Sequence, residues 1–259
     1  MHDHDDFGGL HRDLGLVGAM LKRRDMIRLA AGVGILHLIG CNGDSNGVSD
    51  GCAVIPEETA GPYPGDGSNG PNVLSQSGVV RSDIRSSFAG STGTADGVPL
   101  TVTLAIVSAS SVCALLPGYA VYLWHCDREG RYSLYSSGVT DQNYLRGVQE
   151  TDANGQVTFT TIFPACYSGR WPHIHFEVYP SLAAATDEDN KIATSQLALP
   201  EATCDEVYAT SGYEASVGNL QQVSLTSDNV FGEDDGESQL ATLSGTVAGG
   251  YTATLQVPV

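Results

Sequence analysis

Basic residues are scarce in this chain. Only 12 Lys and Arg stand against 30 Asp and Glu in 259 residues, giving a formal net charge of -18. Residues 1–41 hold as many basic as acidic residues, so the rest of the chain keeps the whole excess. A surface of this sign repels phosphate backbones and anionic lipids, so nucleic acid and anionic membrane surfaces are poor partners. The acidity otherwise indicates only a well-solvated surface.

Several patterns are also missing. There is no C-x-x-C motif for zinc or redox chemistry, no internal repeat and, after residue 41, no long amphipathic helical period. What remains is short segments that alternate apolar and polar residues, separated by turn-forming residues. We expect strands at residues 100–106, 120–125, 156–162, 173–179 and 251–257, and at most a short helical turn at 200–209. The predicted fold class is all-β, a β-sandwich with long functional loops and little helix.

The N-terminal segment has the composition of an export signal. A basic cluster at residues 22–24 precedes an apolar run at 29–39, which is too short to span a bilayer and ends at Cys41. Residues 1–41 therefore resemble a twin-arginine leader with a lipobox, whose Cys41 would carry a lipid anchor. An ordinary amphipathic helix with a chance cysteine is the alternative. We expect an exported lipoprotein, periplasmic or on the outer surface, with a tether and N-terminal arm at 42–98 and the main domain at 99–259.

Five cysteines follow Cys41, so at least one of them is unpaired within a monomer. An oxidising location permits disulfides, but spacing does not determine the pairing. Cys166 could bond Cys204 or another partner and so fix its loop, or it could be a buried thiol. The remaining candidates are Cys52, Cys113 and Cys126.

After residue 41 histidine is rarer still, and its distribution is informative. Four of the seven histidines precede residue 41, and two of the remaining three form the pair His173-Ile174-His175. Alternate side chains of a strand share a face, so both imidazoles would point one way and Ile174 the other. Such a pair is half of a metal site, although most pairs of this kind bind nothing. The third histidine, His125, follows Trp124 at a strand end, and we interpret it as structural.

Three ordered segments extend this pattern. They are Trp124-His125-Cys126-Asp127-x-x-Gly130-x-Tyr132-Ser133, Arg146-Gly147-x-Gln149-x-Thr151-Asp152-x-x-Gly155 and Thr161-Ile162-x-Pro164-x-x-Tyr167-x-x-Arg170-x-x-His173-Ile174-His175. Together they resemble the intradiol ring-cleavage dioxygenases, the family of catechol 1,2-dioxygenase and protocatechuate 3,4-dioxygenase. The spacing from Tyr167 to His173 is short and there is no N-terminal helical dimerisation region, as in the compact exported members.

The resemblance implies one mononuclear non-haem Fe(III). Its ligands would be Tyr132, Tyr167, His173 and His175, and a trivalent cation suits such hard phenolate oxygens because it favours their deprotonation. Tyr167 would also act in catalysis as the ligand that leaves and takes up a proton. The other residues carried over are Arg170, which would offset negative charge on the ring, and Gln196 and Tyr63, which would line the substrate pocket.

The implied reaction cleaves a catechol-type ring between its two hydroxylated carbons with O2, giving a cis,cis-muconate type diacid. The alternative is a non-catalytic exported β-sandwich lipoprotein that binds iron or a phenolic ligand. A zinc hydrolase built on the same histidines is a third candidate, disfavoured because a third His or carboxylate ligand is missing. Which catechol is cleaved, and whether the chain forms a homo-oligomer, are left open by the sequence.

Overall fold

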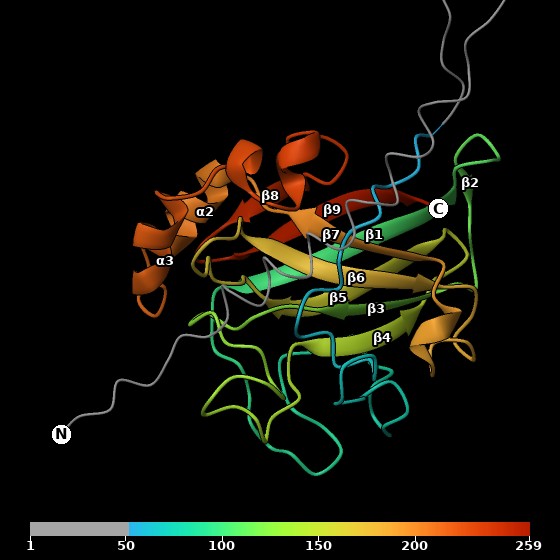
Figure 1. Ribbon diagram of the computed structural model, residues 1–259, viewed down its shortest axis with the longest axis horizontal. Coiled ribbons are helices and arrows are strands. Elements are labelled where there is room, and N and C mark those ends of the chain that lie inside the picture. The colour runs from blue at the N-terminus through green and yellow to red at the C-terminus, as the bar shows by residue number, and fades with distance from the viewer. Residues whose placement is uncertain (1–51) are drawn as a thin grey trace, which may run out of the picture. The chain divides into compact units, whose positions relative to one another are not determined.

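The computed structural model describes residues 52–259, and the predicted leader, with Cys41, lies outside them. Two β-sheets form the fold, as predicted (Figure 1). One sheet contains β1 (Pro99–Ser108), β2 (Ala114–Leu115), β5 (Gln156–Ile162), β8 (Thr242–Thr246) and β9 (Gly250–Pro258), in the order β2-β1-β9-β8 with β5 also paired to β1. The other runs β4 (Arg146–Glu150), β3 (Ala120–Trp124), β6 (His173–Tyr179) and β7 (Ala193–Ala198).

The core lies between the two sheets because each sheet turns one set of alternate residues inward. Along β1, Leu100, Val102, Leu104 and Ile106 are buried while the threonines between them are half-buried. From β6 of the other sheet, Ile174, Phe176 and Val178 join the same apolar cluster. The alternation that predicted these strands is therefore what packs the sandwich.

The outer face of the second sheet is covered as well. Tyr122, Trp124 and Tyr179 lie on this face and pack in a second apolar cluster with buried Val73, Leu74 and Val79 of the segment before β1. The Tyr122 hydroxyl donates a hydrogen bond to the Pro64 carbonyl at 2.7 Å. The N-terminal arm therefore adds a layer to the sheet that carries the histidine pair. The boundary that we place near residue 98 stays a prediction.

All five predicted strands are present, and four further strands were not predicted. β7 is buried along its whole length and β4 carries a fully buried arginine, so neither alternates in polarity. β2 is very short, and β8 is mostly exposed. The predicted turn at 200–209 is a helix, α2 (Glu201–Tyr208), and a second one, α3 (Glu214–Leu220), follows it. Three short 3-10 turns complete the described part of the chain: η1 (Glu188–Asn190), η2 (Leu225–Ser227) and η3 (Phe231–Glu233).

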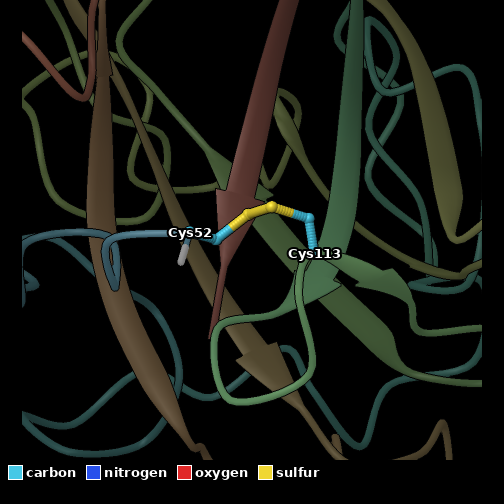
Figure 2. The surroundings of a disulfide bond; sticks show 2 residues. All are labelled: Cys52 and Cys113. Carbon is cyan, nitrogen blue, oxygen red and sulfur yellow. A yellow bond between two sulfur atoms is a disulfide. The ribbon is translucent and has the colours of Figure 1, made fainter. Parts of the chain in front are cut away.

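One disulfide joins Cys52 to Cys113, with the Cα atoms 5.5 Å apart (Figure 2). Cys126, Cys166 and Cys204 are buried free thiols. A disulfide at Cys166, one of two alternatives from the sequence, is therefore wrong. Its sulfur instead donates to the Arg170 carbonyl at 3.4 Å, and burial raises its pKa to about 12. Between residues 52 and 259, no helix is long and apolar enough to cross a bilayer.

Candidate metal centre

The histidine pair lies on one face of β6, as its spacing predicted. Ile174 is fully buried in the core between the sheets, so His173 and His175 face the arm. The Nδ1 atom of His173 is hydrogen-bonded to the Trp171 carbonyl, which can only accept. The Nδ1 atom therefore carries the proton and leaves a lone pair on Nε2. That nitrogen lies 3.1 Å from Nε2 of His175.

Two tyrosines approach the same point from different loops. The hydroxyl oxygen of Tyr167, in the loop after β5, lies 3.2 Å from Nε2 of His173. The hydroxyl oxygen of Tyr132, in the loop between β3 and β4, lies 3.5 Å from the same nitrogen. The four residues that the sequence suggested as ligands are therefore brought together.

The spacing of these donor atoms fits a single ion. Ligands about 2.1 Å from one metal and at roughly 90–110° to each other are about 3.0–3.4 Å apart. The separations between donor atoms here are 3.1, 3.2 and 3.5 Å. Within residues 52–259, no group of three or more His, Cys, Asp and Glu side chains could hold a metal ion. The candidate centre therefore depends on the two phenol oxygens as well as the imidazoles.

Burial keeps the four groups neutral when no cation is present. It raises the pKa of Tyr132 well above its ordinary value and that of Tyr167 to about 12. It also lowers the pKa of both His173 and His175. Neutral imidazoles are ready to bind a metal, whereas the phenols need a strongly charged cation to lose their protons. This donor set fits a trivalent ion.

Arg170 and Gln196 lie together beside the histidines. Gln196 is the neighbour of His175 across the β6–β7 pair, and its Oε1 accepts a hydrogen bond from Nη2 of Arg170 at 2.7 Å. Its Nε2 donates to the Thr59 carbonyl at 2.9 Å, which ties this strand to the arm. Burial lowers the pKa of Arg170, but Tyr167 and Asp228 outweigh that effect and raise it. The guanidinium is therefore cationic at neutral pH.

The arm places Tyr63 and a glycine that was not predicted beside the four donors, and the assignment of Tyr63 to the substrate pocket stays a prediction. The ring of Tyr63 packs 4.9 Å from that of Tyr132, centroid to centroid. Its carbonyl accepts a hydrogen bond from Arg146 at 2.9 Å, which holds the arm in place. Gly61 has φ +70, and a Cβ there would lie 3.4 Å from Cε1 of His175. Glycine therefore lets the arm pass close to the imidazole.

His125 is structural, as its sequence position indicated. It is buried, and its Nε2 is hydrogen-bonded to the Thr161 hydroxyl at 2.7 Å while its Nδ1 is hydrogen-bonded to the Cys126 carbonyl at 2.8 Å. Both ring nitrogens are therefore occupied. Trp171 likewise packs in the core and donates to the Leu199 carbonyl at 2.9 Å.

Three residues at the centre were not identified from the sequence as part of it. Trp124 stacks on the His175 ring at 4.9 Å with an interplanar angle of 5°, which fixes the imidazole plane. Asp228 pairs with Arg170, and Phe231 packs 6.4 Å from the His173 ring. Trp124 opens the first motif segment, so a signal for it existed. Asp228 and Phe231 lie beyond the last motif, where no local pattern marks them.

Comparison with known proteins agrees with this architecture. The dioxygenase family model (Dioxygenase_C) matches residues 70–175. An intradiol ring-cleavage dioxygenase from Tetranychus urticae is 25% identical with a TM-score of 0.63, and the match covers 80% of this chain and 94% of that one. A second dioxygenase structure matches at 25% identity and a TM-score of 0.62, with the same coverage. No curated protein sequence matches the chain.

A third structure supports the fold alone. It is the dioxygenase domain of a dioxygenase and carbohydrate-binding protein fusion from Streptomyces sp. SirexAA-E, at 23% identity and a TM-score of 0.51, covering 80% of this chain and 98% of that one. Fold and family match together define a β-sandwich oxidoreductase of the dioxygenase class. Within that class, the chain is similar to the intradiol ring-cleavage dioxygenases.

Proposed function

We propose that this protein is an Fe(III)-dependent intradiol dioxygenase that cleaves a catechol-type ring between its hydroxylated carbons, using O2, to a cis,cis-muconate type diacid. The observation that carries the proposal is the convergence of two phenol oxygens and two imidazole nitrogens beside a partly buried arginine. Similarity to the intradiol dioxygenases supports catechol-type ring cleavage in general, and that family generally uses Fe(III).

Tyr132, Tyr167, His173 and His175 would hold the ion. When bound, the ferric ion would act as a Lewis acid toward the two catechol oxygens and as an electron acceptor. Tyr167 is the phenol suited to leave and take up a proton at its hydroxyl oxygen, because it is half-buried whereas Tyr132 is only 2% exposed. His173 keeps its orientation throughout because its Nδ1 is fixed by the Trp171 carbonyl.

The remaining residues orient the substrate and compensate charge. Arg170 makes two hydrogen bonds to protein side chains, so three of its five N–H donors are left for the ring or for negative charge that develops on it. Tyr63 of the arm and Phe231 of η3 offer aromatic surface next to Tyr132 and His173 respectively. Such surfaces suit a flat aromatic substrate.

The test combines metal analysis, optical spectroscopy and turnover. The purified protein should contain one iron per chain and show a visible tyrosinate-to-iron band, which catechol shifts anaerobically and O2 then bleaches. Oxygen uptake on a panel of catechols, with identification of the products, gives the substrate. Iron and colour without ring cleavage would favour the non-catalytic binding protein. A colourless protein that takes up no O2 would refute both.

We further propose that the chain is exported and anchored through Cys41. The sequence of the leader suggests this, and the Cys52–Cys113 disulfide supports it because disulfides persist in oxidising compartments. Cell fractionation with Cys41→Ala as the variant tests the anchor. The native protein should partition with membranes and the variant should not, whereas equal partitioning would refute lipidation.

A further inference from the structure

Asp228 lies between η2 and η3 and reaches the metal centre from a distant part of the chain. It is 58 residues after Arg170, yet its carboxylate lies 3.0 Å from the guanidinium Nε, with 0% of the side chain exposed. A buried carboxylate loses its hydration, so it persists only when charge and hydrogen bonds replace the water. The contacts of Asp228 provide both.

All the hydrogen bonds of this carboxylate fix its direction. Oδ2 accepts from Nε of Arg170 at 3.0 Å and from the backbone N–H of Trp171 at 2.6 Å. Oδ1 accepts from the backbone N–H groups of Val230 at 2.8 Å and Phe231 at 3.1 Å. One oxygen therefore holds the arginine and the other holds its own loop. The carboxylate has no freedom to rotate without breaking a contact.

Two neighbouring donors of the Arg170 guanidinium are therefore bound by two different side chains. Gln196 accepts from Nη2 at 2.7 Å, the donor next to the Nε held by Asp228 on the same guanidinium edge. The guanidinium carbon also lies 6.0 Å from the centre of the Phe231 ring, which the Asp228 loop positions. Two anchored donors and one aromatic contact leave the rest of the guanidinium edge in a single orientation.

We propose that Asp228 is a positioning residue for ring cleavage, which acts through Arg170 by fixing the guanidinium in the orientation that meets developing negative charge. This inference rests on the proposed function, because it assigns Arg170 a partner in that reaction. Preorganised charge is effective only when its direction is already set before the reacting charge appears. Asp228 would therefore affect the rate of turnover more than the binding of catechol.

A double-mutant cycle tests this role. Asp228→Asn keeps an oxygen that can accept from the loop N–H groups, but it can place an amide N–H group against the Arg170 donor. Asp228→Ser keeps a shorter hydrogen-bond acceptor and removes the contact with Arg170. Each is made in the native protein and in Arg170→Ala. In the native background kcat should fall about 10- to 100-fold with KM changed less than about threefold. In Arg170→Ala the same substitutions should change kcat less than about twofold.

Iron content and the visible band are measured on every variant to separate the two proposals. The inference is supported if both Asp228 variants keep iron and their effects vanish in Arg170→Ala. The inference is overturned if the Asp228 variants lose iron, if neither Asp228→Asn nor Asp228→Ser folds, or if they slow turnover equally in the native and Arg170→Ala backgrounds. In each case Asp228 serves only its own loop. If the native protein contains no iron or cleaves no ring, the proposed function is overturned instead. The role of Asp228 is tested by the double-mutant cycle alone.

Discussion

Removing the disulfide between Cys52 and Cys113 should destabilise the protein without altering the ligand set. The two cysteines are separated by 61 residues, and that loop contains the arm with Gly61 and Tyr63. A cross-link stabilises chiefly by restricting the unfolded chain, and for a loop of this length the chain-entropy relation gives about 4 kcal/mol at 25 °C. Both cysteines are half-buried, so replacement by serine adds little packing cost.

For a folded part of this size, each kcal/mol corresponds to roughly 2–4 °C in Tm. Cys52→Ser with Cys113→Ser should therefore lower the Tm by about 8–16 °C, measured by calorimetry at neutral pH. Because the loop includes the arm that contacts Tyr132 and His175, the visible iron band should disappear at the same lower temperature.

The matched control is the reductant. It should bring the native protein to the Tm of the double variant and leave the variant unchanged, since the other cysteines in the described chain are buried free thiols. A double variant that melts within about 2 °C of the native protein would refute the reasoning. It would mean that the arm is held by its hydrogen bonds and apolar contacts alone.

Three further predictions concern the site and its surroundings. Tyr132→Phe and His175→Ala should each lose iron, measured by elemental analysis, because each removes one of the four converging donor atoms. The control, Tyr135→Phe, should keep its iron, because Tyr135 contacts Tyr63 but contributes no donor atom to the candidate metal centre. Retention of iron by His175→Ala would contradict the ligand assignment. Arg170→Ala should keep iron and the visible band but lower kcat about 100-fold, measured by oxygen uptake, and unchanged kcat would remove the arginine from the reaction. Burial lowers the pKa of His125 from 6.5 to about 4, so the unfolded chain binds more protons than the folded one between these values. Stability should therefore fall as pH falls from about 6.5 to 4, and His125→Gln should reduce that slope by one proton; an unchanged slope would show that His125 titrates normally.

Much of the fold and the central part of the site could be predicted because they are encoded locally. Alternation with period two specified β1 and β6, and the same rule placed His173 and His175 on one face with Ile174 in the core. Tyr167 and Arg170 lie within a few residues of that strand. Strands without alternation, such as the wholly buried β7, could not be recognised this way.

The sequence alone determined which side chains are candidate metal donors, their order along the chain, and the strand that pairs two of them. Only the tertiary structure decided which distant groups complete and fix the centre. Asp228 beside Arg170, Trp124 stacked on His175, and Cys52 bonded to Cys113 each join residues separated by tens of positions. The physical reason is that a strand's period acts over a few residues, whereas such contacts follow from how the sheets, arm and loops pack.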